Sequence, residues 1–456
     1  MTGAFVQMIR GKGLVTRALR ASVIIGSGFA AQQVIRLGSN LILTRLLFPE
    51  AFGMMALVTV VLTALNMFSD LGIGPSIMGS ARGDDRDFLD TAWTIQIGRG
   101  VILWLLALIF TWPVAQWYGE ADLLQYLPVA ALSLIIQGFY PTQRETANRH
   151  LRAGRLTMVE LGAQLVGIAV GVILAWLTQS IWALVISGVA ASLALLVGLN
   201  LFLPGPANRL RWEKAAAAEL IHFGKWIFLS TFMAFAISQS DKVILGRLLD
   251  LGTFGLFNIA WFLASVPMLM GGMVMGRVLI PVYRESPPAA ARENFIRIRN
   301  MRAAAMAVLL AMVTALAFLG HWLVDFLYDD RYLDAGAMTV LIAAVQVPAL
   351  VIMTCDHAAL AAGDSRRYFS YTAIRALTVT VGIVAGWGVA DLPGAVIGQA
   401  LGHLASWPAL GWLLHPHRAW DWRLDAVTGM IGALLGALAI AVNAGPVSAL
   451  FLSAGG

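Results

Sequence analysis

Residues 41–55 read LILTRLLFPEAFGMM, and residues 243–257 read VILGRLLDLGTFGLF. Seven of the fifteen aligned positions are identical at a constant shift of 202 residues, which pairs Arg45 with Arg247. A long segment that recurs at a fixed distance indicates a duplicated structural unit. Each copy places one arginine in an apolar run, and we interpret both arginines as helix-end residues whose charged heads reach the membrane surface.

The composition indicates a membrane protein. Of 456 residues, 59% are hydrophobic and 12% are charged, whereas a soluble domain has about 25% charged residues. The apolar residues form continuous runs, many of them about 18 residues or longer, which is the length that a transmembrane helix needs. Continuous runs favour helices over a β-barrel, whose strands alternate apolar and polar residues. The single cysteine, Cys355, gives no information about the redox compartment.

We therefore expect an all-α, polytopic membrane protein with twelve core spans and one or two further C-terminal hydrophobic segments. The expected spans are 21–47, 51–79, 91–117, 123–147, 157–178, 181–203, 223–247, 252–283, 302–328, 334–362, 368–390 and 393–415, with a thirteenth candidate at 425–444. The shift of 202 residues equals six spans. Because six is even, the sequence predicts two six-helix bundles in the same orientation, related by an axis along the membrane normal.

The repeat divides the chain into five expected parts. They are a basic N-terminal segment (1–20), an N-terminal six-helix bundle (21–203), an interfacial linker (204–222), a C-terminal six-helix bundle (223–415) and an extension with an extra span (416–456). Residues 206–222 of the linker have the pattern of an amphipathic helix at the membrane surface. The basic N-terminal segment is not interpreted as part of a cleaved signal, because the first span belongs to the repeat.

Positive charges predict the orientation. Every second connection is basic: 144–155 holds four arginines and 284–302 holds five, whereas the alternate connections hold only Arg331 and several carboxylates. By the positive-inside rule the N-terminus is cytoplasmic. The net charge of +6 is explained by this bias, so we expect no nucleic acid partner.

Three stretches resemble a known family. They are QSDKVILGRLLDLGTFGLFNIA (239–260), FSDLGIGPSI (68–77) and RHLRAGRLTMVELG (149–162), and they are similar to the Wzx-like polysaccharide flippases of the multidrug/oligosaccharidyl-lipid/polysaccharide exporter (MOP) superfamily. The resemblance covers most of residues 20–415. It implies two helical bundles facing a central cavity, and an activity that moves a polyprenyl-diphosphate-linked oligosaccharide outward for exopolysaccharide or O-antigen synthesis. It also implies the bacterial cytoplasmic (inner) membrane, with membrane lipids and a polymerase or co-polymerase of the same pathway as partners.

Ionisable residues inside apolar spans are the candidates for a site, because a charge in lipid is costly unless it faces a cavity or a partner. Arg36 lies mid-span with Asn40 on the same helical face, and its alternative role is an ion pair with Asp70. Arg99 and Arg375 lie about 12 Å into their spans. The expected substrate-binding residues are Arg36, Asn40, Arg99, Asp241, Lys242, Arg375 and Gln399, and the expected ion-coupling residues are Asp70, Asp241 and His403.

The sign of these charges favours an anionic substrate. Arginine binds phosphate oxygens in pairs, so deep arginines suit a diphosphate. A multidrug or cation antiporter of the same superfamily, which would present carboxylates instead, is the alternative, and a flippase for a lipid-linked peptidoglycan precursor is the third reading.

The motifs that would mark an enzyme are missing from the sequence. There is no Walker-type glycine–lysine loop and no Cys/His spacing typical of a metal site. We therefore expect a transporter driven by an ion gradient, with no catalytic residues, cofactor or bound metal.

Overall fold

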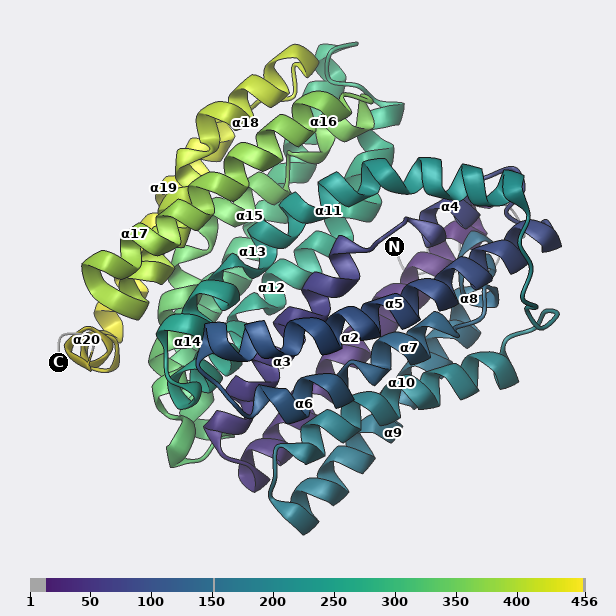
Figure 1. The fold of residues 1–456 in the computed structure, drawn as a ribbon. Helices are drawn as coiled ribbons and strands as arrows, with labels where there is room; N and C mark the ends of the chain where they lie inside the picture. The colour runs from purple at the N-terminus through teal and green to yellow at the C-terminus, as the bar shows by residue number, and fades with distance from the viewer. Residues whose placement is uncertain (1–13, 151, 454–456) are drawn as a thin grey trace. The chain divides into compact units, whose positions relative to one another are not determined.

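The computed structural model describes residues 14–150 and 152–453, and every regular element within them is a helix (Figure 1). The chain divides into two compact units, Met1–Phe232 and Met233–Gly456. The division falls inside α11 (Lys214–Leu248), so this helix begins in the first unit and ends in the second.

The first unit is built from nine helices before α11. These are α2 (Leu14–Leu46), α3 (Pro49–Phe68), α4 (Ile73–Gly79), α5 (Arg86–Tyr118), α6 (Leu123–Ala130), α7 (Leu132–Gly138), α8 (Gln143–Arg149), α9 (Ala153–Thr178) and α10 (Trp182–Phe202), counted within the described residues. The second unit continues after α11 with α12 (Leu251–Glu285), α13 (Arg292–Leu327), η1 (Asp330–Tyr332), α14 (Asp334–Val345), α15 (Val347–Met353), α16 (His357–Ala361), α17 (Ser365–Ala405), α18 (Trp407–Leu414), η2 (His415–His417), α19 (Trp422–Val442) and α20 (Ala444–Ser453).

The duplicated segment occupies the same place in both units. Helix α2 ends at Leu46 and α11 ends at Leu248, and the next helices begin at Pro49 and Leu251. Both pairs of boundaries differ by the 202 residues of the sequence repeat. Arg45 and Arg247 lie in the last turns of their helices, where both are exposed.

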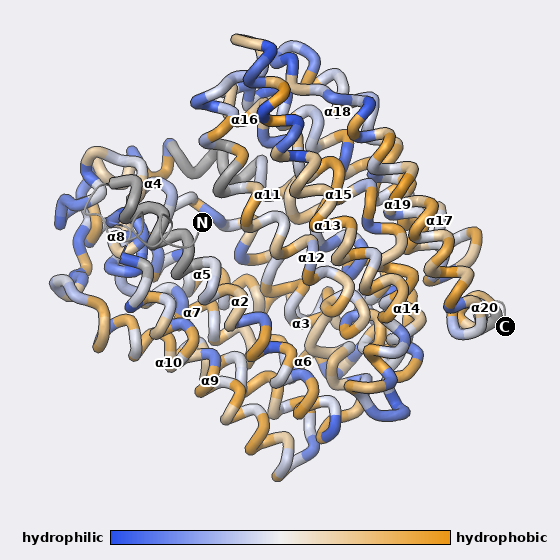
Figure 2. Tube along the Cα trace, turned by 180° about the vertical axis from the view of Figure 1, so that it is seen from behind, coloured by the Kyte–Doolittle hydropathy of each residue, from blue (hydrophilic) through white to orange (hydrophobic). Residues whose placement is uncertain are grey.

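Eight described helices are long and apolar enough to cross a membrane, and two bent helix pairs raise the number to ten. The bent pairs, Leu123–Gly138 with Gln143–Arg149 (61°) and Asp330–Val345 with Val347–Ala361 (47°), fall in the expected fourth and tenth spans. Figure 2 shows apolar residues along α9, α10 and α17, and hydrophilic residues around α4 and α8. The prediction of an all-α polytopic membrane protein is confirmed.

Helix α17 is folded back on itself near its middle. Ala390 and Asp391 leave the helical conformation, with φ of −154° and 45°. Beyond them the backbones of the two arms touch: a Cβ added to Gly382 would lie 2.1 Å from the carbonyl oxygen of Gly398, and one on Gly386 would lie 2.0 Å from that of Gly394. This register is that of two antiparallel helices, and it supports separate spans at 368–390 and 393–415.

Polar residues between the apolar runs determine where helices begin. Asp85 precedes α5 and accepts a hydrogen bond from the backbone N–H of Asp87, and Asp421 precedes α19 and accepts one from that of Leu424. Such side-chain caps satisfy N–H groups that have no partner within the helix. Helix α5 ends at Tyr118 and is followed by Gly119, whose φ of 76° suits glycine.

The linker differs from the expected amphipathic helix. Residues 204–213 are irregular, and only 214–222 are helical, as the start of α11. The irregular part is held by hydrogen bonds from its own groups: the Asn208 amide donates to Asp90 and to Thr142. Three backbone N–H groups of this stretch, at residues 209, 211 and 213, donate to side chains of α5. They therefore have partners without the hydrogen bonds of a helix.

Candidate functional site

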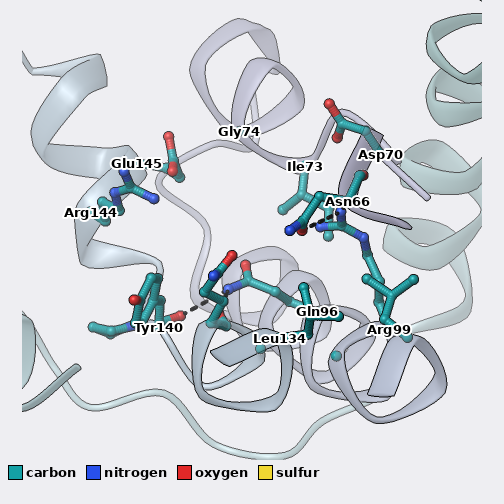
Figure 3. Close-up of a pocket in the computed structure, with 15 residues that line it drawn as sticks. Asn66, Asp70, Ile73, Gly74, Gln96, Arg99, Leu134, Tyr140, Arg144 and Glu145 are labelled. Atoms are coloured by element: carbon teal, nitrogen blue, oxygen red, sulfur yellow. Dashed lines mark hydrogen bonds between the residues drawn. The ribbon is translucent and has the colours of Figure 1, made fainter. Parts of the chain in front are cut away.

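A polar pocket of about 170 Å³ lies inside the first unit (Figure 3). Figure 3 shows Asn66, Asp70 and Arg99 on one side of it and Arg144 and Glu145 on the other. The break between α3 and α4 brings Asp70 to the pocket, because Gly72 has a positive φ of 60° and its N–H binds the Asp70 carboxylate at 2.8 Å. Pockets for whole ligands usually exceed about 300 Å³, so this one fits a small charged group rather than a sugar chain.

Arg99 is held in place by the end of α3. Its Nε donates to the Ser69 hydroxyl at 2.9 Å, and its Nη2 donates to the Asn66 carbonyl at 2.8 Å. Its Nη1 makes no hydrogen bond to the described residues. Nη2 also donates to the Asn66 side-chain oxygen at 3.5 Å. A guanidinium that is held by these three hydrogen bonds and keeps one amino group available is prepared to bind an anion.

The charges of this pocket are more balanced than the sequence analysis expected. Two carboxylates, Asp70 and Glu145, line it together with Arg99 and Arg144. Arg144 is paired with Glu160 at 3.3 Å, and Arg99 interacts electrostatically with Asp70. Arg99 nevertheless keeps an amino group without a hydrogen bond to the described residues.

A second polar cluster lies in the second unit and joins three of its segments. Arg375 on the first arm of α17 donates from Nε to His403 Nδ1 on the second arm at 3.3 Å. Its Nη1 lies 3.6 Å from Asp356, which sits between α15 and α16. Asp356 also lies 2.7 Å from His357 Nδ1. The structure thus brings together the predicted residues Arg375 and His403, with Asp356 and His357 as additional members.

The contact with Arg375 determines the state of His403. A guanidinium can only donate hydrogen bonds, so Nδ1 of His403 must accept, which requires the neutral ring with its proton on Nε2. Protonation at Nδ1 would place two donors against each other. In this conformation His403 therefore orients Arg375 and does not carry an extra proton.

Asp241 and Lys242 lie in the second unit beside an aromatic ring. Asp241 is buried, and one of its oxygens accepts the backbone N–H of Lys242 at 2.8 Å. The Lys242 ammonium lies 3.6 Å from the centroid of the Trp261 ring, which stabilises the cation. The Asp241 carboxylate is also hydrogen-bonded to the Trp261 side chain. The two side chains thus share Trp261 as a partner, although adjacent positions on a helix point in different directions.

The remaining predicted residues lie outside these clusters. Arg36 is exposed on α2, and Asn40 is half-buried one turn further along. Neither is among the described residues that line the Arg99 pocket. Gln399 is half-buried on the second arm of α17. Within the described residues, no group of three or more His, Cys, Asp or Glu side chains could hold a metal.

Sequence reasoning missed one buried arginine. The positive-inside rule groups Arg302 with the cytoplasmic charges of 284–302, but in the structure Arg302 is 1% exposed and pairs with Asp425 on α19. The repeat points to its neighbourhood only: the shift of 202 residues aligns Arg99 with Met301, one residue before Arg302. The six-span shift likewise pairs α5 with α13.

The fold of this chain is shared with solved transporters of the MOP superfamily. The structure is similar to an inward-facing multidrug resistance MATE family transporter of that superfamily (TM-score 0.64, 14% identity, 85% of this chain and 95% of that chain). It is also similar to the lipid II flippase MurJ in an inward closed conformation (TM-score 0.66, 13% identity, 94% of this chain and 98% of that chain). At these identities the similarity establishes the fold alone.

The chain belongs to the family described as "Polysaccharide biosynthesis protein", which matches residues 42–337. It is 24% identical over 296 residues to the lipopolysaccharide biosynthesis protein WzxC of Escherichia coli, covering 62% of this chain and 59% of that protein. It is 23% identical over 270 residues to the succinoglycan biosynthesis transport protein ExoT of Rhizobium meliloti, covering 59% and 53%. The matches thus span between half and three-fifths of these relatives. The predicted membership of the Wzx-like family is confirmed, and the chain is grouped with transporters rather than enzymes.

Proposed function

We propose that the protein is a secondary-active flippase, which moves a polyprenyl-diphosphate-linked oligosaccharide from the cytoplasmic to the outer leaflet of the inner membrane. The product would serve exopolysaccharide or O-antigen synthesis. The observation that carries this proposal is the fixed guanidinium of Arg99, which keeps Nη1 available in an internal polar pocket of a polysaccharide biosynthesis family member. The names of WzxC and ExoT support the same class of pathway. A polymerase or co-polymerase of that pathway is the expected protein partner.

The proposed architecture assigns one helix, helix arm or bent helix pair to each of twelve core spans. Helices α2 and α11, with 33 and 35 residues, form the first and seventh spans, and both exceed the roughly 20 residues that a span requires. The two arms of α17 form the eleventh and twelfth, and α19 is an additional span. The equal 202-residue shift of the helix ends supports two bundles, 21–203 and 223–415, in the same orientation.

In the proposed mechanism, arginines neutralise the diphosphate while polar side chains contact the sugar. Arg99 binds phosphate oxygens through Nη1, and Arg36, Lys242 and Arg375 supply further positive charge along the path. Asn40 and Gln399 donate and accept hydrogen bonds to sugar hydroxyls. Movement of the coupling ion involves Asp70, Asp241 and the Arg375–His403 pair, in which neutral His403 fixes the guanidinium.

The orientation has a direct test by cysteine labelling from outside intact spheroplasts. The background is Cys355→Ser, because Cys355 is buried and is the one free cysteine. The labelled positions are exposed: Asp122 and Asp330 are expected outside, and Ala207 and Ser365 inside. A membrane-impermeant thiol reagent should label only the first two. Labelling of Ala207→Cys from outside would reverse the proposed topology.

The alternative is a multidrug or cation antiporter of the same superfamily. The carboxylates Asp70 and Glu145 in the Arg99 pocket favour it, as does the fold shared with a MATE transporter. A peptidoglycan-precursor flippase is the third candidate, since its diphosphate lipid has the same chemistry at the arginines.

Thermal stabilisation by ligands separates the first two candidates. A ligand that binds only the folded protein stabilises it by about 2.7 kcal/mol at 100 times its dissociation constant. A short-chain polyprenyl-diphosphate oligosaccharide should therefore stabilise the reconstituted wild type, and stabilise Arg99→Gln much less, whereas ethidium should stabilise neither. Stabilisation by ethidium but not by the diphosphate would establish the antiporter. A peptidoglycan precursor that stabilises the protein better than other oligosaccharides would favour the third candidate.

A further inference from the structure

A long apolar groove runs between α9 and α10 in the first unit, and it is separate from the Arg99 pocket. The two helices lie side by side (Figure 1), and close contacts such as Gly198 with Val159 and Gly167 with Ala191 show that they are antiparallel. Small residues, among them Gly162 and Ala194, form the floor of the groove. Its volume is about 1010 Å³, which is at the upper end of the range for ligand sites.

The walls of the groove are aliphatic and exposed. Met158 on α9 is 75% exposed, and Leu193 and Leu201 on α10 are 50% and 70% exposed. Side chains of this kind next to small residues are suited to contact a hydrocarbon chain. Among the lining residues, only Arg155 carries a charge, and it lies at the end where α9 begins.

A polar pocket of about 400 Å³ adjoins this end of the groove. Arg155 lines both cavities, and the pocket is further lined by His150, Arg152, Gln143 and Thr146. His150 is paired with Asp84 at 2.8 Å. Arg152 and Arg155 are exposed and have no ion-pair partner among the described residues. No described carboxylate lines the pocket, so its uncompensated charge is positive.

We propose that the groove and the pocket together form a binding site for an anionic phospholipid. The phosphate head group binds to Arg152 and Arg155, and the acyl chains lie along α9 and α10. Charge complementarity selects the occupant, because basic pockets between membrane helices bind anionic head groups and each nearby arginine contributes to the attraction. Because the cationic pocket adjoins an apolar groove, the site suits a lipid, which has both a phosphate and acyl chains, better than a free phosphate. This inference goes beyond the proposed function, and it requires only that α9 and α10 span the membrane.

Two kinds of variant separate the head-group and chain contacts. Arg152→Gln with Arg155→Gln removes the charge, with Arg209→Gln as the control, because Arg209 is an exposed arginine of the linker. Gly162→Leu fills the groove: nothing lies within 4 Å of a Cβ at Gly162, and leucine favours a helix more than glycine does. Gly188→Leu on α10 is its control, since it also has open space but does not line the groove.

Native mass spectrometry of delipidated full-length protein measures the binding of phosphatidylglycerol, phosphatidylcholine and glycerol 3-phosphate. We expect phosphatidylglycerol to bind most tightly to the wild type and to both controls. Each arginine is worth about 1 kcal/mol near a membrane surface, so the double glutamine variant should bind it roughly 30-fold more weakly. Gly162→Leu should also lose binding while it retains the thermal stability of the wild type.

Four results would overturn the proposal. If phosphatidylcholine bound the wild type as tightly as phosphatidylglycerol, the charge of the head group would not matter. If Gly162→Leu bound phosphatidylglycerol as tightly as the wild type, the acyl chains would not lie in the groove. Equal binding of glycerol 3-phosphate would indicate a phosphate site that needs no acyl chain. Displacement of phosphatidylglycerol by a short-chain polyprenyl diphosphate at equal concentration would assign the site to the transported lipid. None of these measurements depends on transport, so they leave the proposed flippase activity untouched.

Discussion

The guanidinium of Arg302 on α13 pairs with the carboxylate of Asp425 on α19, and both side chains are almost fully buried (1% and 3% exposed). Arg302 also lies within hydrogen-bond distance of the Thr354 hydroxyl, at 3.4 Å. The pair connects the C-terminal extension to the interior of the second unit. The extension is thus part of the core of this unit.

Removal of one partner of this pair should be strongly destabilising. Asp425→Ala leaves the Arg302 charge buried without compensation, which costs about 3–5 kcal/mol. The double variant Arg302→Met with Asp425→Leu should recover most of that loss, since it removes both charges and keeps the volume. Thermal unfolding of the purified variants in detergent checks this expectation.

A neighbouring ion pair supplies the control for that experiment. Arg299 on α13 and Asp421, which precedes α19, lie 3.0 Å apart; Asp421 is 9% exposed, but Arg299 is 49% exposed. Asp421 keeps the backbone N–H of Leu424 as a partner, and solvent screens the Arg299 charge, so we expect this pair to contribute about 1 kcal/mol or less. Arg299→Ala should therefore change the unfolding midpoint little, and a loss as large as that of Asp425→Ala would contradict the role given to burial.

Neutralising the internal arginines should reduce polysaccharide export at normal protein levels. A hydrogen bond to a charged group is worth about 1.5–3 kcal/mol, so Arg99→Ala or Arg375→Ala should weaken apparent substrate affinity about ten- to hundredfold. Arg36→Ala tests the third predicted position, and lysine should restore part of the function at each. Surface polymer per cell and protein level by immunoblot are the measurements. Normal export by all three alanine variants would make the arginines structural.

The backbone contact inside α17 should tolerate no side chain. A Cβ on Gly386 would lie 2.0 Å from the carbonyl oxygen of Gly394, so Gly386→Leu must force the two arms apart. We expect loss of folded protein in detergent, measured by monodisperse yield. Gly388→Leu is the matched control, because nothing lies within 4 Å of a Cβ at Gly388. Equal yields for the two variants would show that the arms do not touch.

The stability of the turn between α4 and α5 should depend on pH, because the Asp84 carboxylate contributes to it. The hydrogen bond with His150 and, to a smaller extent, the nearby Arg149 hold the pKa of the Asp84 carboxyl below its ordinary value of 3.8. A lowered pKa stabilises the folded state above the ordinary value, and this contribution disappears as the pH falls through the lowered pKa. Hydrogen exchange of residues 80–87 should be faster in Asp84→Asn than in the wild type at pH 7. The difference should shrink toward acid pH, and a difference that grows there would contradict the sign.

The long apolar runs predicted the helices well, because lipid leaves the backbone few alternatives to helical hydrogen bonds. The breaks inside the runs were harder to predict. The expected span 51–79 is divided by a turn at Ser69–Gly72 that brings Asp70 to the Arg99 pocket. The sequence SDLGIG contains the polar and glycine residues of such a turn. The apolar residues on both sides of it favoured the prediction of one continuous span.

The sequence indicated which residues belong to the candidate site, but not which of them contact one another. Burial cost alone identified Arg99, Arg375 and His403 as unusual. The contact between Arg375 and His403 requires the register of the α17 arms, which no local pattern determines. Glycines at 382, 386, 394, 398 and 402 were the available signal, since small residues four apart mark close helix contacts in membranes.

The glycine contacts of α17 also limit what a transport cycle can change. The close backbone contacts between the two arms oppose sliding, so we expect the arms to move as one body. Arg375 and His403 lie on opposite arms and should then stay in contact. Asp356 belongs to another segment, so we expect its 3.6 Å approach to Arg375 to be the contact that such a movement changes. We therefore expect the contact between Asp356 and Arg375 to change during transport, whereas His403 keeps the Arg375 guanidinium in position.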